Sequence, residues 1–298
     1  MKMKRILLAA GAAVLSLSLF AGCGKKGDVV QIGHKNYTEQ RILGQMLSVL
    51  LEEKLGYATE VREFGGTNIV FEALRTGDVA MYPEYTGTAY GSILGESGLK
   101  DAQEVYNHVK QVYRDEYGLL WLEQMGFNNT YTFAVLPEVA EAYNLKTFSD
   151  LSKVAGELTM VSTTEFLERE DGLPGVKEAY GGFEFGNTMA MDPGLRYAAI
   201  SEKKGDVMDA FSTDGKLIEF ELVVLEDDLG FFPPYFVAPL LNGAYAEEHP
   251  EVVEELNRLQ GNISDEEMQQ MNYQVDNLGV NEKEVAREFL ESKGLLDQ

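Results

Sequence analysis

The sequence predicts an α/β protein built of two interleaved lobes, and three observations point to it. Short apolar strands alternate with amphipathic helices from Val29 onward, as in folds whose helices cover largely parallel sheets. With 298 residues, of which 45% are hydrophobic, the chain is long enough for two lobes of ordinary size. No low-complexity linker divides the sequence, so the lobes are expected to share the chain in alternation.

The first half supplies strands and helices in turn. The clearest helix is the one that begins at Thr38, because apolar residues recur along one of its faces. Those apolar residues are Ile42, Leu43, Met46, Leu47, Leu50 and Leu51. In chain order we expect a strand over residues 29–33, a helix over 38–54, a strand over 59–64, a helix over 68–75, a strand over 79–82 and, after Thr88, another helix.

The second half repeats this style without repeating the sequence. We expect strands over residues 130–136, 158–161, 206–211 and 222–225, with a helix over 193–203 between the second and third of them. An extended, proline-rich segment follows over residues 231–241. The C-terminal part is expected to be helical over residues 250–259, 265–275 and 281–293.

These elements divide into one lobe of residues 29–128 with 236–298 and a second lobe of residues 129–235. Two neighbouring crossovers between the lobes would form a hinge. A ligand would bind in the cleft between the lobes, at the carboxyl ends of the strands.

The N-terminus has the layout of a secretory signal over residues 1–22. Lys2, Lys4 and Arg5 precede an apolar run that is too short for the roughly 20 residues needed to cross a bilayer. The run ends in Phe20-Ala21-Gly22-Cys23, which resembles a bacterial lipobox, although Phe20 stands where leucine is usual. This resemblance implies that Cys23 is lipidated and that residues 23–28 form a tether; a plain signal peptide with an incidental cysteine is the alternative.

Composition excludes several classes of function. Cys23 is the only cysteine, so the folded part has no disulfide, thiol nucleophile or cysteine metal site. A formal charge of −24 argues against nucleic acid as a partner. His34, His108 and His249 are scattered, and no nucleophile elbow, zinc-protease motif or phosphate loop occurs. We therefore expect a protein that is not an enzyme and that carries no cofactor or metal.

Aromatic residues at the ends of predicted strands are the positive signal. Tyr85 follows one strand, Tyr131 begins another, Phe211 ends a third and Tyr235 lies in the proline-rich segment. Each of them taken alone could be an ordinary core residue. Asp214 and Gly215, just after Phe211, are interpreted as a turn.

Together, four motifs resemble a known family over residues 29–294. The motifs are Gly33-His34-Lys35-Asn36-Tyr37-Thr38-Glu39, Tyr82-Pro83-Glu84-Tyr85-Thr86-Gly87-Thr88, Ser212-Thr213-Asp214-Gly215 and Phe231-Phe232-Pro233-Pro234-Tyr235. They look like those of the substrate-binding subunits of osmoprotectant ABC importers, which bind glycine betaine, carnitine, choline or proline betaine. The resemblance implies a type II periplasmic-binding-protein fold and a ligand held in an aromatic box of four tyrosines.

Matching motif by motif places that box on Tyr85, Tyr131, Phe211 and Tyr235, with Phe211 where tyrosine is typical. Such a box suits the ligand class, because a quaternary ammonium cannot donate a conventional hydrogen bond. Aromatic faces instead offer it a negative quadrupole and apolar contact, worth about 0.5–2 kcal/mol each.

Further positions match those that hold the ligand's carboxylate in some members of the family. Lys35 follows the first strand, Thr88 lies at a helix start and Arg169 could fork onto a carboxylate. Asn129 either lines the box or serves a turn. The presence of both Lys35 and Arg169 favours a zwitterionic betaine over choline.

The sequence thus predicts a monomeric, membrane-tethered extracytoplasmic lipoprotein that binds a betaine and delivers it to ABC permease subunits. One alternative keeps the fold but takes a bulkier trimethylammonium compound, such as a histidine-derived betaine, or choline. Another is a lipoprotein enzyme that acts on choline-type compounds through a carboxylate pair. A purely structural surface lipoprotein is the last alternative.

Overall fold

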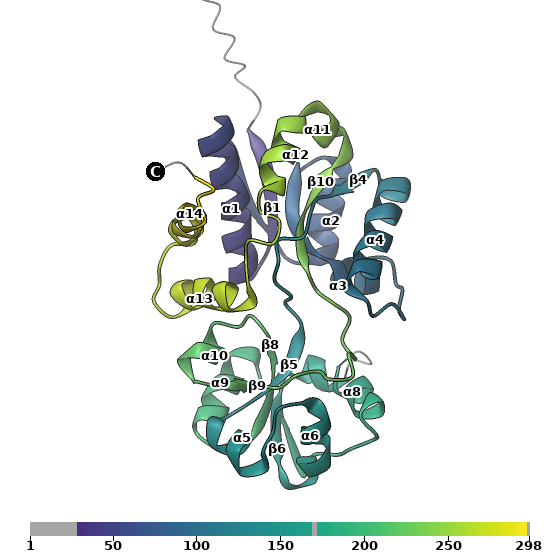
Figure 1. The fold of residues 1–298 in the computed structure, drawn as a ribbon, viewed down its shortest axis with the longest axis vertical. Helices are drawn as coiled ribbons and strands as arrows, with labels where there is room; N and C mark the ends of the chain where they lie inside the picture. Colours follow the sequence, from purple (N-terminus) through teal and green to yellow (C-terminus); the bar gives the residue numbers. More distant parts are fainter. Residues whose placement is uncertain (1–28, 169–171, 297–298) are drawn as a thin grey trace, which may run out of the picture.

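The computed structural model describes residues 29–168 and 172–296, which form two lobes, each built on its own five-stranded sheet (Figure 1). The predicted signal, the lipidation site Cys23 and the predicted ligand contact Arg169 lie outside these residues. Lobe 1 is the part that contains β1–β4, β10, α1–α4 and α11–α14, and lobe 2 the part that contains β5–β9 and α5–α10.

The sheet of lobe 1 has the strand order β2-β1-β3-β10-β4. Its strands β1 and β2, and β1 and β3, pair in parallel, whereas β10 pairs antiparallel with both β3 and β4. The strands are β1 (Val30–Lys35), β2 (Thr59–Phe64), β3 (Met81–Tyr85), β4 (Leu119–Trp121) and β10 (Val237–Asn242).

The sheet of lobe 2 repeats this plan in the order β7-β6-β8-β5-β9. Its strand β6 is parallel to β7 and β8, and β5 is antiparallel to β8 and β9. The strands are β5 (Tyr131–Val135), β6 (Thr159–Ser162), β7 (Asn187–Ala190), β8 (Val207–Phe211) and β9 (Val223–Val224).

The strands that enter each sheet from the other lobe, β5 and β10, are the antiparallel ones. The parallel strands end at the side of the sheet that faces the other lobe, so a chain arriving from there must run the opposite way. Because β4 and β9 pair antiparallel with β10 and β5, they run in the same direction as the parallel strands, and the expected largely parallel sheets are each interrupted by one reversed strand.

The two crossovers lie side by side between the lobes (Figure 1). Asn128 forms an antiparallel bridge with Phe236, and the Asn129 backbone N–H donates to the Tyr235 carbonyl at 3.2 Å. The Tyr235 backbone N–H in turn donates to Oδ1 of Asn128 at 2.7 Å. Both connections are thereby held in register where they pass between the sheets.

Helices cover both sheets. In lobe 1 they are α1 (Thr38–Leu55), α2 (Thr67–Thr76), α3 (Thr86–Thr88), α4 (Ala102–Val112), α11 (Gly243–Glu248), α12 (Pro250–Asn257), α13 (Asp265–Asp276) and α14 (Glu282–Ser292). In lobe 2 they are α5 (Pro137–Tyr143), α6 (Phe148–Val154), α7 (Thr164–Glu168), α8 (Leu173–Ala179), α9 (Pro193–Ser201) and α10 (Lys216–Glu219). Short π- and 3₁₀-helical turns occupy Ala89–Ile93, Tyr113–Tyr117 and Ala155–Glu157.

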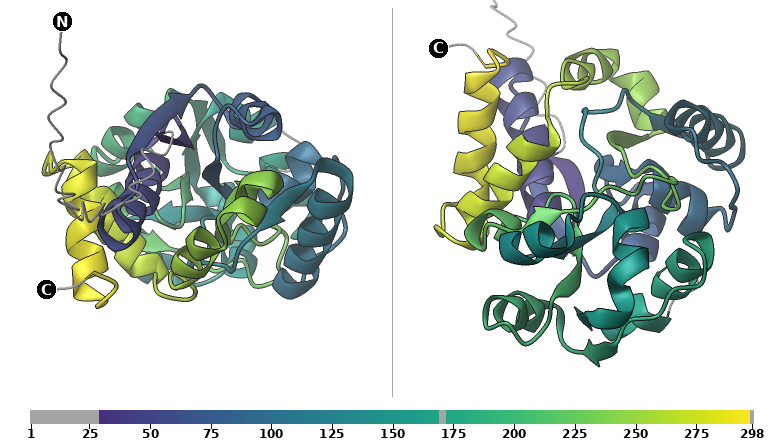
Figure 2. Two further views of the ribbon diagram at one scale, coloured as in Figure 1. Left: turned by 90° about the horizontal axis from the view of Figure 1, so that it is seen from above. Right: turned by 60° about the horizontal axis from the view of Figure 1, so that its bottom comes forward.

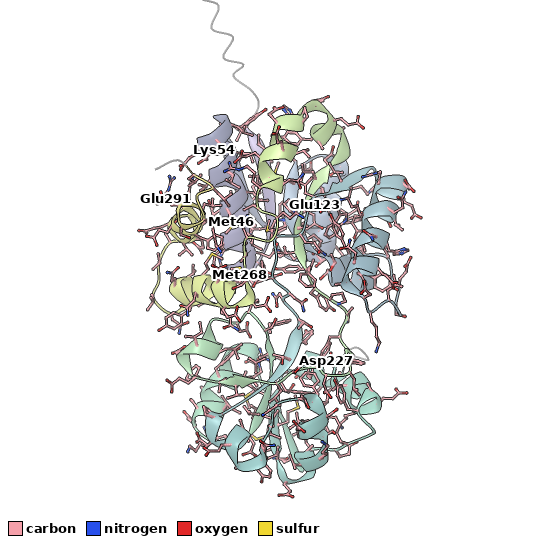
Figure 3. The ribbon with its side chains drawn as sticks, in the orientation of Figure 1. Met46, Lys54, Glu123, Asp227, Met268 and Glu291 are labelled. Carbon is pink, nitrogen blue, oxygen red and sulfur yellow. The ribbon has the colours of Figure 1, made fainter. Side chains whose placement is uncertain are left out.

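The core of lobe 1 forms around α1, which packs against β1 and the C-terminal helices α12–α14 (Figures 1 and 2). Every residue of the predicted apolar face of α1 is fully buried. Met46 of α1 and Met268 of α13 are both 0% exposed and belong to the same apolar cluster (Figure 3). Residues distant in the sequence thus share one core, as the interleaved arrangement requires.

Most predicted elements coincide with observed ones to within two or three residues. The strand predicted over 79–82 begins later, at Met81, and runs to Tyr85. The sequence did not predict α4, α11, β4, β7 or the short helices of lobe 2. Within the part of the chain that the structure describes, no helix is both long and apolar enough to cross a membrane.

Candidate ligand-binding site

A cavity of about 200 Å³ lies between the lobes and is lined from both of them. Its wall consists of Tyr37, Thr67, Tyr85, Thr88, Ser92, Asn129, Tyr131, Phe211 and Tyr235. Lobe 1, lobe 2 and the two crossovers each contribute side chains. Such a position at the strand ends is where α/β folds bind ligands.

The structure brings all four predicted aromatic residues to this one cavity. Tyr85 is the last residue of β3 and Phe211 is the last residue of β8, so the two lobes present a ring from the same place in their sheets. Tyr131 opens β5 directly opposite Phe211, and Tyr235 lies in the returning crossover. Thr88 and Asn129, also predicted as contacts, line the same cavity.

The Tyr235 ring needs a glycine beside it. A Cβ added to Gly87 would lie 2.7 Å from Cδ1 of Tyr235 and 2.9 Å from the carbonyl oxygen of Pro234. Only glycine therefore lets the Tyr82–Thr88 segment approach this crossover, which explains why Gly87 stands in the motif.

On the lobe 2 side the cavity wall rests on other aromatic rings. The Tyr131 centroid lies 4.4 Å from that of Phe211 and 5.2 Å from that of Phe166. Phe232 lies on the same ring at 5.8 Å, and both Phe166 and Phe232 are buried. These tilted contacts fix the rings by packing, each worth about 0.5–1.5 kcal/mol beyond area burial.

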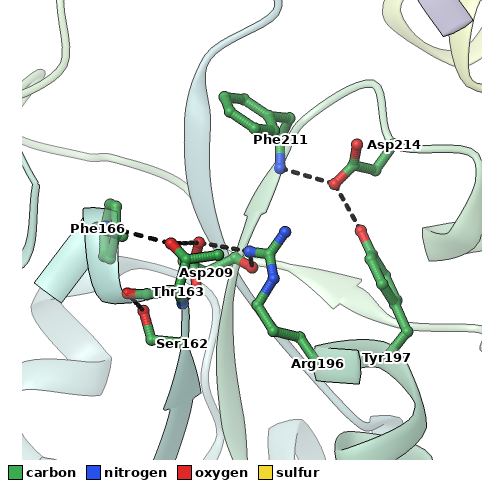
Figure 4. Close-up of polar contacts among 8 residues, drawn as sticks. All are labelled: Ser162, Thr163, Phe166, Arg196, Tyr197, Asp209, Phe211 and Asp214. Carbon is green, nitrogen blue, oxygen red and sulfur yellow. Dashed lines mark hydrogen bonds and ion pairs between the residues drawn. The ribbon is translucent and has the colours of Figure 1, made fainter. Parts of the chain in front are cut away.

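Polar groups behind the cavity wall hold the end of β8, where Phe211 lies (Figure 4). The Phe211 backbone N–H donates to Oδ2 of Asp214 at 3.1 Å, and the Tyr197 hydroxyl donates to the same oxygen at 2.6 Å. Burial raises the pKa of the Asp214 carboxyl. Arg196 forms a buried ion pair with Asp209 below this site. Asp214 and Gly215 form the expected turn, and Asp214 also anchors the end of β8.

On the lobe 1 side Tyr85 is held by hydrogen bonds. Its hydroxyl donates to Oε1 of Glu39 at 2.5 Å, and its backbone N–H donates to Oε1 of Glu84 at 2.7 Å. Burial raises the pKa of the Tyr85 phenol well above its ordinary value, so this hydroxyl stays protonated. Tyr85 is 3% exposed, and its ring is fixed as firmly by these bonds as the lobe 2 rings are by packing.

Lys35 does not line the cavity. Its Nζ lies 2.5 Å from Oε1 of Glu84 and 5.3 Å from the centroid of the Tyr85 ring, with Lys35 5% exposed. The ammonium thus sits behind Tyr85, compensating a buried carboxylate.

The sequence reading did not single out Tyr37, Thr67 and Ser92 as members of the wall, nor Glu39 behind it. Tyr37 and Glu39 stand in the first of the four motifs, which was the available signal. Thr67 follows a glycine pair that indicated only a turn. Ser92 lies in the π-helical turn Ala89–Ile93, which no periodicity predicted.

No group of three or more His, Cys, Asp or Glu side chains in residues 29–168 and 172–296 is arranged to hold a metal ion. The cavity wall presents ring faces, hydroxyls and an amide. Its described residues include no pair of a nucleophile and a general base. This wall can surround a small cation and bind a polar group beside it.

Comparison with known proteins identifies relatives over nearly the whole chain. Residues 28–292 match the OpuAC family, described as the substrate-binding domain of an ABC-type glycine betaine transport system. The carnitine transport binding protein OpuCC of Listeria monocytogenes is 36% identical over 295 residues, 98% of this chain and 96% of that protein. The ergothioneine transport permease/ergothioneine binding protein EgtU of Helicobacter pylori is 38% identical over 267 residues, 89% of this chain and 47% of that protein.

A solved structure also agrees with the architecture. The crystal structure of a glycine betaine/carnitine/choline ABC transporter has a TM-score of 0.85 and 34% sequence identity, covering 90% of this chain and 100% of its own. The predicted two-lobed α/β binding-protein fold is confirmed.

Proposed function

The chain belongs to the OpuAC family of substrate-binding domains of ABC-type glycine betaine transport systems, and on that premise we propose that it binds glycine betaine or a similarly small trimethylammonium compound. As a member of this family it is an extracytoplasmic binding component of an importer and not an enzyme. Its partners are a small-molecule ligand and the permease subunits of that importer.

The observation that carries the proposal is that four rings from distant stretches of chain meet in one inter-lobe cavity. Ring faces attract a cation through their quadrupole and cover its methyl groups at the same time. Four contacts of about 0.5–2 kcal/mol each supply much of the roughly 8 kcal/mol behind micromolar binding.

A ligand in this cavity touches both lobes. Tyr85 and Thr88 belong to lobe 1, and Tyr131 and Phe211 belong to lobe 2. A ligand that contacts both walls binds the closed arrangement more tightly than an open one and thereby shifts the protein toward closure. The permease would recognise the closed form.

For the ligand's carboxylate we propose Thr88 and Arg169, with Asn129 beside the methyl groups. Thr88 lines the cavity at the end of α3, close to Tyr85. Lys35 then affects the ligand only indirectly, because its ammonium forms an ion pair with Glu84. This differs from the direct carboxylate contact that the family resemblance implies for Lys35.

A second candidate ligand is a bulkier betaine such as ergothioneine. Two observations favour it: the loss of a hydroxyl at Phe211 and the 38% identity to the Helicobacter pylori protein. The cavity of about 200 Å³ favours the smaller ligand, because sites for larger, drug-sized molecules measure roughly 300–1,000 Å³.

We further propose that the protein is a monomer held at the membrane by lipid on Cys23. The motif Phe20-Ala21-Gly22-Cys23 and the short tether that follows it support this. Metabolic labelling with a fatty-acid analogue should mark the wild type and not a Cys23→Ala variant. Label that persists in the variant would contradict the assignment.

The ligand is tested by thermal shift and calorimetry with glycine betaine, carnitine, proline betaine, choline and ergothioneine. A ligand that binds the folded state raises the melting temperature by mass action, by an amount equivalent to about 2.7 kcal/mol at 100 times Kd. We expect glycine betaine to give the largest shift at equal concentration. The absence of any shift or heat across all five compounds would sink the proposed function.

A further inference from the structure

One carboxylate lies directly behind the cavity wall without being part of it. Glu39, in the first turn of α1, is 3% exposed. Its Oε1 accepts from the Tyr85 hydroxyl at 2.5 Å and from Nδ2 of Asn129 at 2.8 Å. Tyr85 and Asn129 both line the cavity, so Glu39 acts on the wall through two of its members.

Glu39 has two further partners, the side chain of Thr213 after β8 and that of Asn272 on α13. Nδ2 of Asn272 donates to Oε2 of Glu39 at 3.2 Å and to the Thr213 carbonyl at 2.8 Å. Because a carbonyl can only accept, the second bond fixes the Asn272 amide with its NH₂ toward Glu39. The partners of Glu39 are therefore donors, which suit an ionised carboxylate. Burial raises the pKa of Glu39, and the side-chain hydrogen bonds from Thr213, Tyr85, Asn129 and Asn272 oppose that rise.

These partners are neutral. Among the described residues, the ion pair at this end of lobe 1 joins Lys35 to Glu84, and no ion pair involves Glu39. The negative charge of Glu39 thus remains uncompensated by a protein cation within the part of the chain that the structure describes. A cation in the cavity would compensate this charge.

Glu39 also determines which atoms the wall presents. Since a carboxylate only accepts, the Asn129 amide must turn its NH₂ toward Glu39, which leaves Oδ1 as an acceptor. That Oδ1 is buried and has no hydrogen-bond partner among the described residues. From behind the wall surface, the partial negative charge of this oxygen favours a positively charged ligand in the cavity.

Glu39 also makes the Tyr85 ring more favourable for a positive ligand. A phenol that donates to a carboxylate is polarised toward its ring, which makes the ring face more negative. The oriented amide, the polarised ring and the nearby charge all favour a positive ligand.

We propose that Glu39 is the specificity-determining residue that makes this cavity select a positive charge over a neutral group of the same shape. It acts as a positioning residue through Tyr85 and Asn129 and by its own charge, without contacting the ligand. The inference rests on the proposed function, since it specifies how the same cavity recognises a trimethylammonium group.

The test compares glycine betaine with 3,3-dimethylbutanoate, which has the same shape and carboxylate but a carbon in place of the charged nitrogen. Both are titrated calorimetrically into the wild type and Glu39→Gln. We expect Glu39→Gln to weaken glycine betaine about tenfold, as loss of one nearby charge through a dielectric of about 20 implies. The neutral-headed ligand should bind Glu39→Gln more tightly than it binds the wild type.

A matched control is Glu53→Gln at the far end of the same helix, where Glu53 pairs with Arg287. It removes the same charge about 21 Å away along the helix axis and should leave both affinities unchanged. If Glu39→Gln does not fold, Asn272→Lys places an ammonium beside Glu39 and should reproduce the tenfold loss.

Opposite responses of the two ligands support the inference, because a damaged cavity would lose both. Parallel losses, an unchanged affinity for glycine betaine, or a Glu39→Gln variant that rejects the neutral-headed ligand as fully as the wild type would overturn it. A wild type that binds no trimethylammonium compound would instead remove the proposed function, so the two failures are distinguishable.

Discussion

The two lobes build their halves of the cavity wall from the same parts but connect them differently. Each lobe ends its third core strand with an aromatic residue, Tyr85 on β3 and Phe211 on β8. Among the residues that the structure describes, one cation and two carboxylates lie behind each ring. They are Lys35, Glu84 and Glu39 in lobe 1, and Arg196, Asp209 and Asp214 in lobe 2.

The two lobes differ in the surroundings of the carboxylate that is not part of the ion pair, Glu39 in lobe 1 and Asp214 in lobe 2. In lobe 2, burial raises the pKa of Asp214, and bonds from the Tyr197 hydroxyl and the Phe211 backbone N–H oppose that rise, as does the positive charge of Arg196. In lobe 1, Glu39 accepts from the hydroxyl of the Tyr85 ring itself, and no cation among residues 29–168 and 172–296 forms an ion pair with it. The comparison teaches that lobe 2 uses its charges to hold the fold, whereas lobe 1 keeps one charge available to the ligand.

The largest expected effect concerns the buried ion pair that each lobe contains. Glu84→Ala and Asp209→Ala each remove the carboxylate of a buried ion pair, which typically costs about 3–5 kcal/mol. The free energy of unfolding is measured by urea titration. The exposed pair of Glu72 with Arg75 is the control, and Glu72→Ala should leave the free energy nearly unchanged. If only one of the two variants lost little unfolding free energy, the two ion pairs would not have equivalent roles in their lobes.

The same titration shows whether the lobes unfold together. The single tryptophan, Trp121, is buried in lobe 1, so its fluorescence reports on that lobe, while circular dichroism reports on both. We expect Asp209→Ala to shift both signals together, because interleaved chains share their crossovers. Separate transitions would mean that lobe 1 is stable on its own.

A smaller effect should separate the two rings. Tyr85→Phe removes a donor from buried Glu39, which costs about 1–3 kcal/mol of stability, and it should weaken glycine betaine about tenfold. Phe211→Tyr adds a hydroxyl to a half-buried ring without removing a bond, and we expect a change in affinity below about threefold. Calorimetry measures both, and equal effects would contradict the assignment of ligand charge selection to lobe 1.

The sequence predicted the parts of the site that depend on strand ends. Tyr85, Tyr131, Phe211 and Tyr235 could be foreseen because strand alternation and motif order place them at one edge. Lys35 shows the limit of this reasoning: its position was right, but its ammonium faces Glu84, a choice set by packing between β1 and β3.

Glu39 could not be found in this way. Its importance comes from Asn272, which lies on α13 at the other end of the chain, and from Asn129 in a crossover. Such a convergence depends on how the C-terminal helices pack on α1, and no local pattern specifies it. The antiparallel crossovers were missed for a similar reason, because strand direction follows from which lobe the chain leaves.

The smallest effect tests whether the charge on Asp214 is needed at all. Its folded pKa is raised, so the folded state holds the proton more tightly than the unfolded chain. That contribution to stability is therefore present at acid pH and is lost as the pH rises through the folded pKa. Asp214→Asn, whose amide oxygen can still accept from Phe211 and Tyr197, should gain stability relative to the wild type as the pH rises.

The difference in unfolding free energy between wild type and Asp214→Asn, measured from pH 4.5 to 7.5, should grow by about 1.4 kcal/mol for each unit by which the pKa is raised. Taking the difference cancels the many exposed carboxylates whose pKa is lowered. The variant should also keep the preference for glycine betaine over 3,3-dimethylbutanoate, unlike Glu39→Gln. If Asp214→Asn lost that preference as well, the selecting charge would belong to the cavity as a whole and not to lobe 1.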